Sequence, residues 1–336
     1  LIVGICISVF IFGDSLNEII KALNFLLIYF VGKNGTLYSR NKEKFIHFSI
    51  FCVFLGNLIQ LTLDYIYNYG KTYEEGQRLI MSVWTHDYVS VTIIGLLSAA
   101  IIGYSYYGIF VGKNKLIKLI SAFSIILTIV VNLSTATRTP IVLIAVVFML
   151  MTIVYFMKIG SIKKMKLLFF IPLLFFILFL IFKTNCFGIK TYIESSNLSM
   201  RMKKSGLETS RIDISKEYFK YMYLYCFGGS NIKKIVGIEA HNYLQQGYDM
   251  YGMLSFIGLI VITVNLWKNA ICLLLKKSSN RIIFLLLSMF LALYIQCCLE
   301  PVFTAYPICF WTLLMIDGMM TTLNQKHSSL YSEEVY

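Results

Sequence analysis

Residues 117–157 read IKLISAFSIILTIVVNLSTATRTPIVLIAVVFMLMTIVYFM, which is two apolar runs joined by a short polar turn. A helix needs about 20 residues to cross the hydrocarbon core of a bilayer, and somewhat fewer where its end residues snorkel. The runs at 117–133 and 140–157 are close to that length. In the turn, Thr139 and Pro140 suit the N-cap and the first position of a helix. The stretch therefore predicts a hairpin of two membrane-spanning helices.

The composition of the whole chain is that of a membrane protein. Of its 336 residues, 58% are hydrophobic and only 14% are charged, and the mean hydropathy is +0.73. These values are far from those of a soluble domain. We expect an all-α, polytopic transmembrane helix bundle, and we interpret the short run LIVGICISVFIF at 1–12 as a truncated helix that precedes the complete spans. Nine complete spans are predicted, at 16–32, 45–63, 90–110, 117–133, 140–157, 167–182, 249–267, 282–298 and 302–320.

The connections between these spans differ in their basic residues, and this difference predicts the orientation. Short cytoplasmic loops retain Lys and Arg, so the lysine-rich connections are expected inside. The net charge of +13 then reflects topology and attraction to anionic lipid, and no nucleic-acid partner is expected. The basic residues of the four inner connections are Lys33, Arg40, Lys42 and Lys44; Lys113, Lys115 and Lys118; Lys158, Lys163, Lys164 and Lys166; and Lys268, Lys276, Lys277 and Arg281.

One long connection breaks the pattern of short loops. It is predicted to be extracytoplasmic, and its stretch ETSRIDISKEYFKYMYLYCFGG has the apolar and charged faces of an amphipathic helix lying on the bundle or the membrane. The chain is thus expected to divide into an N-terminal transmembrane bundle (1–182), the large outer loop (183–247), C-terminal transmembrane helices (248–320) and a cytoplasmic tail (321–336).

The sequence shows no pattern typical of a metal site. No two aspartates stand one residue apart, so the Asp-x-Asp grip used with nucleotide sugars is missing. Cys186 and Cys226 both fall in the outer loop, and whether they pair is open. No ligand spacing joins the four histidines, which are His47, His86, His241 and His327.

Polar residues suited to chemistry gather at the outer ends of the predicted spans. Arg138 stands beside a predicted helix N-terminus, where backbone N–H groups and a guanidinium suit an anion, although an arginine that snorkels to headgroups fits equally well. Taken alone, Arg211 fits a solvated loop charge better than a binding residue. His241 fits a capping role or a catalytic one, and Glu300 at a hairpin tip also fits simple solvation.

Several short motifs resemble the O-antigen polymerase and O-antigen ligase superfamily. They are LSTATRTP at a helix start, SRID and FGG in the outer loop, AHNYLQQGYDMYG ahead of a span, and CLEPVF before the last span. The resemblance covers about residues 90–320, and its most specific part is the histidine-asparagine motif followed by a glycine and a span. The chain departs from the Ser-Arg-Gly common in that family at Thr137, Arg138 and Thr139.

The resemblance implies a GT-C-like membrane glycosyltransferase that uses undecaprenyl-diphosphate-linked saccharides with neither a metal nor a cofactor. Arg138 and Arg211 would hold the diphosphate, and His241 would lie near the reacting hydroxyl as the catalytic base. Asn242 and Glu300 complete the implied substrate-binding residues. These roles agree with the chemistry, because a leaving diphosphate needs its negative charge stabilised and an attacking hydroxyl must lose a proton.

A helix that starts near Asn242 would place further polar groups beside this site. The side chains of Asn242, Gln246 and Asp249 would share one face, which we expect to bind sugar hydroxyls. Tyr248 or Tyr251 would stack on a sugar ring, although tyrosines at a membrane boundary are more often interface anchors.

The expected function is polymerisation of lipid-linked repeat units into O-antigen or capsular polysaccharide, on the outer face of the bacterial cytoplasmic membrane. Membrane lipid and the lipid-linked saccharide are the expected partners, and a chain-length regulator is a candidate protein partner. A ligase that transfers finished polymer to another acceptor shares the motifs and is the alternative. A non-enzymatic transporter would show charged residues inside its spans and two similar halves, whereas the ionisable cluster is expected at the outer rim.

Overall fold

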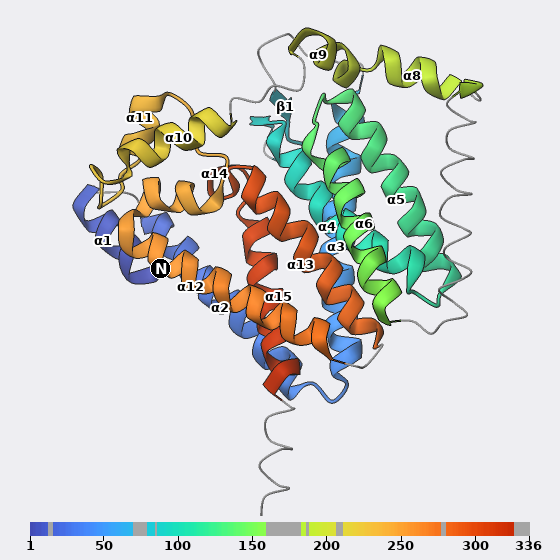
Figure 1. Ribbon diagram of the computed structural model, residues 1–336, viewed down its shortest axis with the longest axis horizontal. Helices are drawn as coiled ribbons and strands as arrows, with labels where there is room; N and C mark the ends of the chain where they lie inside the picture. The colour runs from blue at the N-terminus through green and yellow to red at the C-terminus, as the bar shows by residue number, and fades with distance from the viewer. Residues whose placement is uncertain are drawn as a thin grey trace, which may run out of the picture.

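The computed structural model describes residues 1–12, 16–69, 79–84, 86–158, 183–185, 188–205, 211–276 and 280–325. These residues form a helical bundle with one small antiparallel hairpin (Figure 1). The elements are α1 (Ile2–Phe12), α2 (Leu16–Tyr38), α3 (Lys42–Tyr67), β1 (Leu79–Met81), β2 (Tyr88–Ser90), α4 (Thr92–Phe110), α5 (Lys115–Ser134), α6 (Thr139–Lys158), α8 (Ile189–Ser195), α9 (Asn197–Ser205), α10 (Arg211–Met222), α11 (Asn231–Val236), α12 (Tyr243–Leu275), α13 (Arg281–Leu299), α14 (Val302–Ala305) and α15 (Ile308–Gln325).

Six of the described helices, α3, α4, α5, α6, α12 and α13, are long and apolar enough to cross a membrane. The chain is therefore a helical, multi-pass membrane protein, as its composition predicts. The predicted spans at 16–32 and 302–320 correspond to α2 and α15, which carry more polar side chains. The predicted span at 167–182 lies outside the described residues, so the count of nine stays a prediction.

The predicted span at 302–320 has the wrong boundaries. The short helix α14 ends before Tyr306, whose φ of −158° and ψ of 79° are not helical, and α15 begins after Pro307. Proline lacks a backbone N–H and disfavours the helical conformation in the residue before it. The outer end of this hairpin is therefore a short separate helix.

The helices α4 and α13 form the centre of the bundle. Within the most apolar stretch of each, 83% of the α4 residues and 72% of the α13 residues are buried, compared with 22% for α6. A helix that is apolar on all sides is typical of such a central position. The backbones approach closely at Gly103, where an added Cβ would lie 2.9 Å from the Met289 Cα. The remaining long helices surround this pair (Figure 1).

The long helix α12 is bent at Gly252, where φ is 81°. An L side chain is strained at this φ, and a Cβ there would also lie 2.5 Å from the Cys226 carbonyl oxygen. That oxygen accepts a hydrogen bond from the Met253 N–H at 2.8 Å. The bend separates a first segment at 243–251, beside α10 and α11, from the long apolar part of α12.

The helix ends that border the lysine-rich connections and the predicted site residues lie at opposite ends of the bundle. At one end, Lys158 Nζ donates to the Lys276 carbonyl at 2.5 Å, and Asn280 Nδ2 donates to Glu43 at 2.6 Å. At the other end, Asn197 Nδ2 donates to the Ser134 carbonyl at 2.7 Å. The short helices α8 to α11 and α14 gather at this second end (Figure 1). It is called the rim below.

Candidate functional site

The predicted site residues Arg211 and Glu300 form an ion pair at the rim. Arg211 Nη2 donates to Glu300 Oε1 at 2.7 Å, and Thr139 Oγ1 donates to the same oxygen at 2.8 Å. The Glu300 residue is 4% exposed, whereas the Arg211 side chain is 32% exposed. Glu300 follows α13, Arg211 begins α10 and Thr139 begins α6, so this carboxylate ties three helices together.

The Thr139 side chain does not cap α6 as predicted. The Arg138 carbonyl accepts a hydrogen bond from the Val142 N–H at 3.3 Å, which gives Arg138 the N-cap position. The Thr139 hydroxyl instead donates to Glu300. Since Thr139 is 7% exposed, a hydrogen bond to the buried carboxylate replaces the local cap.

His241 completes this cluster. Its Nδ1 lies 3.7 Å from Glu300 Oε2, which is too long for a hydrogen bond. Nδ1 is buried and has no hydrogen-bond partner among the described residues. The side chain as a whole is 28% exposed. One edge of the ring therefore faces the carboxylate, and the exposed part of the ring is elsewhere.

The Glu300 carboxyl remains ionised despite its burial. Burial alone would raise its pKa, but the neighbouring His241 and the charge of Arg211 outweigh that effect. The Thr139 hydroxyl also favours the ionised form. The pKa of Glu300 is consequently held below its usual value, because opposite charges and hydrogen-bond donors stabilise the carboxylate.

A third arginine, Arg201, joins Arg138 and Arg211, and the sequence analysis did not single it out. Arg201 Nη1 donates to the Ala136 carbonyl at 2.9 Å, which holds α9 against the turn before α6. Burial lowers the pKa of Arg201, and the nearby charges of Arg138 and Arg211 lower it further. Three guanidinium groups against one carboxylate leave an excess of two positive charges. In the sequence, Arg201 is one of many basic residues in the long outer loop, and only the fold distinguishes it.

The polar face predicted on the first segment of α12 is mostly used within the protein. Asn242 Oδ1 accepts from the Leu244 N–H at 2.8 Å and caps α12. Gln246 Oε1 accepts from the Phe303 N–H at 3.0 Å, and Gln246 Nε2 donates to Thr304 at 2.8 Å. The Ile232 N–H donates to Asp249 Oδ1 at 2.8 Å, at the start of α11. Gln246 and Asp249 are 3% and 4% exposed, so we correct their predicted role from sugar binding to structural ties.

The two tyrosines considered for stacking on a sugar are also buried. Tyr248 is 0% exposed and its hydroxyl donates to the Met222 carbonyl. Tyr251 is 5% exposed and its hydroxyl donates to Glu18 Oε2 at 2.6 Å. Neither ring is accessible to a ligand, so both predicted roles, sugar platform and interface anchor, are wrong. The Tyr248 ring packs in a cluster with residues of α10, and the Tyr251 ring contacts Phe303 of α14.

A pocket of about 290 Å³ lies next to the ion pair, below α10. It includes Arg211, His241 and Asn242, so it is continuous with the candidate site. The other lining residues are Ile212, Ser215, Lys216, Phe219, Gln245, Cys298 and Leu299.

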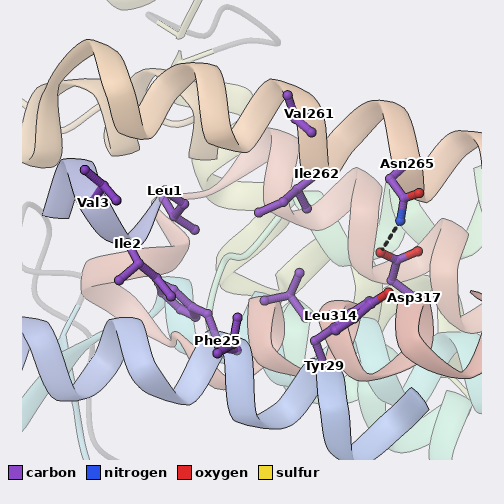
Figure 2. A pocket seen from close by; sticks show the side chains of 11 residues that line it. Leu1, Ile2, Val3, Phe25, Tyr29, Val261, Ile262, Asn265, Leu314 and Asp317 are labelled. Atoms are coloured by element: carbon purple, nitrogen blue, oxygen red, sulfur yellow. Dashed lines mark hydrogen bonds between the residues drawn. The ribbon is translucent and has the colours of Figure 1, made fainter. Parts of the chain in front are cut away.

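A larger pocket of about 480 Å³ lies within the bundle, between α2, α12 and α15 (Figure 2). Its wall is mostly apolar, and one end carries Asp317, whose Oδ2 accepts from Asn265 Nδ2 at 2.9 Å. Figure 2 shows this hydrogen bond at the end of the pocket away from Leu1, Ile2 and Val3. None of the predicted site residues lines it.

The described residues contain no group of three or more His, Cys, Asp or Glu side chains suited to a metal ion. Cys226 is exposed with a free thiol, and Cys186 lies outside the described residues, so their pairing stays open.

Comparison with known proteins adds no relative: neither a protein-family model nor a curated protein matches the chain.

Proposed function

We propose that the chain is a membrane glycosyltransferase that transfers a saccharide from a polyprenyl diphosphate, and specifically that it polymerises undecaprenyl-diphosphate-linked repeat units. The observation that supports this proposal is the meeting of Arg211, Thr139, Glu300 and His241 at one end of the bundle, with Arg138 and Arg201 beside them. These residues come from five separate parts of the chain. A positively charged site with a histidine suits an anionic leaving group and a hydroxyl nucleophile.

In this proposal the arginines bind the diphosphate of the donor. The excess positive charge of the cluster complements two phosphate groups, and a guanidinium contacts phosphate oxygens through two N–H groups at once. Negative charge on the diphosphate grows as the sugar leaves, so the same contacts strengthen in the transition state. Glu300 fixes the position of Arg211 and keeps the guanidinium oriented.

His241 is the proposed base. The Glu300 carboxylate lies 3.7 Å from Nδ1, so a negative charge lies beside the ring that would accept the proton. The acceptor hydroxyl would lose its proton to the imidazole as its oxygen attacks the anomeric carbon. This assignment gives each charged group of the cluster a separate task.

The proposal places the rim on the outer face of the bacterial cytoplasmic membrane. The lysine-rich connections lie at the opposite end of the bundle, and short basic loops favour the cytoplasm. Cysteine labelling tests this orientation. In a cysteine-free background, Lys220→Cys on α10 should react with an impermeant thiol reagent added to intact cells, and Lys113→Cys should not. The reverse result would exclude an outer-face site.

The activity is tested with purified protein in lipid vesicles that contain polyprenyl-diphosphate-linked repeat units. Elongated lipid-linked products are expected, and the variant Arg211→Lys should lose most of the rate. Transfer of preformed polymer to a different acceptor, without elongation, would favour the ligase alternative. Absence of any transfer by the wild-type protein would contradict the proposed function.

A transporter of lipid-linked sugars is the second candidate, and the position of Asp317 favours it. This aspartate is 2% exposed inside α15, and ionisable residues inside membrane helices often mark transport pathways. Asp317 lies within the predicted span at 302–320, apart from the ionisable cluster at the rim. Movement of lipid-linked saccharide across the vesicle membrane, with no new glycosidic bond, would support this candidate.

A further inference from the structure

The pocket of about 290 Å³ beside the ion pair opens on the exposed side of His241. The Nδ1 edge of the imidazole is buried and lies 3.7 Å from Glu300 Oε2. His241 is part of the pocket wall, and because Nδ1 is buried we infer that Nε2 is the ring nitrogen that faces the pocket. Thr139 and Glu300 are absent from that wall. A hydroxyl that loses its proton to Nε2 must approach from this pocket.

Helix α10 presents two different apolar faces, and only one of them packs against the protein. Ile214 and Tyr218 are 7% and 0% exposed and belong to a cluster with Tyr248. Ile212 and Phe219 are 65% and 62% exposed, and both line the pocket. The predicted amphipathic helix is thus present, but its apolar residues divide between a packed face and an open one. The open face places an accessible aromatic ring beside His241.

Some polar groups of the pocket hydrogen-bond to each other, and one remains available to a ligand. Ser215 and Gln245 hydrogen-bond to each other, with Gln245 Nε2 donating to Ser215 Oγ at 2.8 Å. Asn242 uses its Oδ1 to cap α12, and the described residues provide no acceptor for its Nδ2. The Asn242 amide N–H₂ is therefore an available donor in the wall that holds His241 and Phe219.

We propose, building on the glycosyltransferase function above, that this pocket is the acceptor subsite and binds the terminal sugar ring of the attacking saccharide. Phe219 packs on the apolar face of the ring, and Asn242 Nδ2 donates to a ring hydroxyl. Aromatic side chains with a few placed polar groups are typical of small-ligand pockets. The pocket volume is close to the lower end of such sites, about 300–1,000 Å³, which suits one sugar ring and not a whole repeat unit.

The position of this subsite fits the following step of glycosyl transfer from the donor to the acceptor. The acceptor oxygen forms a bond to the anomeric carbon of the donor, and its proton passes to His241 Nε2. The bond between that carbon and the diphosphate oxygen breaks, and its electron pair leaves with the diphosphate. Arg211 borders both the ion-pair cluster and the pocket, so the donor diphosphate and the acceptor ring lie on either side of it.

The test varies only the concentration of the acceptor, at a saturating concentration of lipid-linked donor. The acceptor probe is the soluble, fluorescently labelled oligosaccharide repeat unit released from the lipid carrier of the producing cells. We expect Phe219→Leu to raise the KM for this acceptor about threefold to tenfold, with kcat changed less than about twofold, because the aromatic contact is lost. Phe219→Trp should retain a KM near that of the wild type. Phe227→Leu is the matched control, since Phe227 lies in the turn after α10, is 61% exposed and does not line the pocket.

A second variant tests the polar contact. Asn242→Ser keeps a capping oxygen for α12 but removes the amide donor, so the acceptor KM should rise while the protein folds and binds donor normally. An active wild type with equal acceptor KM for Phe219→Leu and Phe227→Leu would overturn the acceptor subsite and leave the glycosyltransferase proposal intact. An inactive wild type would contradict the glycosyltransferase proposal itself, and the acceptor subsite with it.

Discussion

Two buried carboxylates, Glu300 and Asp317, lie in different surroundings within the same bundle. Glu300 is 4% exposed at the rim, and its partners are the Arg211 guanidinium and the Thr139 hydroxyl. Asp317 is 2% exposed within α15. Its partners are neutral amides, with Asn269 Nδ2 donating to Oδ1 at 2.7 Å and Asn265 Nδ2 to Oδ2 at 2.9 Å.

This difference is the one expected between the proposed binding site and a structural tie. Around Asp317, both amide partners come from α12, and they hold α15 in register. Around Glu300, the cation that it orients is itself 32% exposed and lines a pocket. A buried carboxylate with a partly open cation can position that cation for a ligand, whereas one paired with neutral amides ties helices together even where it borders a pocket, as Asp317 does.

The largest effect is expected from His241. We predict that His241→Ala lowers the elongation rate about 100-fold to 10,000-fold, the usual loss for a general base. The measurement is the initial rate of elongation by purified protein in vesicles, after matching protein amounts. His86→Asn is the matched control, because His86 is exposed in a loop of the described structure and lies outside the candidate site. Equal rates for both variants would mean that the rim cluster is not catalytic.

A smaller effect is expected from Arg201. Arg201→Gln should weaken binding of the donor about 10-fold to 100-fold, since a charge-assisted hydrogen bond contributes about 1.5–3 kcal/mol. Lys203→Gln on the same helix is the control, because Lys203 is exposed. Donor binding is measured by titration with a polyprenyl diphosphate. If the two variants bind it equally well, Arg201 only holds α9 against the turn at Ala136.

A substitution at Arg138 tests whether this residue binds the diphosphate or anchors the protein at the membrane interface. Lysine keeps the charge of Arg138 but loses the planar fork that contacts two phosphate oxygens. An interface anchor would tolerate Arg138→Lys with nearly full activity, because attraction to headgroups needs only a cation. A diphosphate ligand should lose about 10-fold or more in rate. Elongation rates of Arg138→Lys and of the control variant Lys203→Arg, at an exposed position of α9, distinguish these two roles.

For Glu300, the measured quantity is stability. Glu300→Gln should lower the free energy of unfolding by about 1.5–3 kcal/mol at neutral pH, because Arg211 loses its counter-charge while remaining partly buried. Because the pKa of Glu300 is lowered in the folded protein, its stabilisation is complete above the ordinary value of 4.5 and is lost as pH falls through the lower folded value. The difference between wild type and variant, measured by thermal unfolding in detergent, should therefore shrink only below about pH 4.5. Glu217→Gln, at an exposed ion pair, should change little at any pH.

Sequence patterns predicted the helices better than the site. Runs of apolar residues predict helices in lipid because each backbone group must find a partner within its own segment. The site residues Arg138, Arg211, His241 and Glu300 meet at the rim, but Arg201 was missed because its role depends on how the outer loop folds back. The sugar-binding face predicted from helical spacing was wrong, because period alone does not show whether a polar face meets solvent or another helix.

The smallest effect is expected from Asp317. Asp317→Asn places an amide where two amide donors converge, so about one hydrogen bond is lost, and such bonds between membrane helices contribute about 0.6 kcal/mol on average. Elongation should remain within about twofold of the wild-type rate, because the site at the rim is untouched. The reciprocal exchange, Asp317→Asn combined with Asn265→Asp, restores a carboxylate and an amide across α12 and α15 and should recover the lost stability. If Asp317→Asn instead abolished function while stability was retained, and the exchange failed to rescue it, the carboxylate would be needed at that position in α15. Asp317 would then be the functional carboxylate of the two, and a transporter would become the better explanation of this bundle.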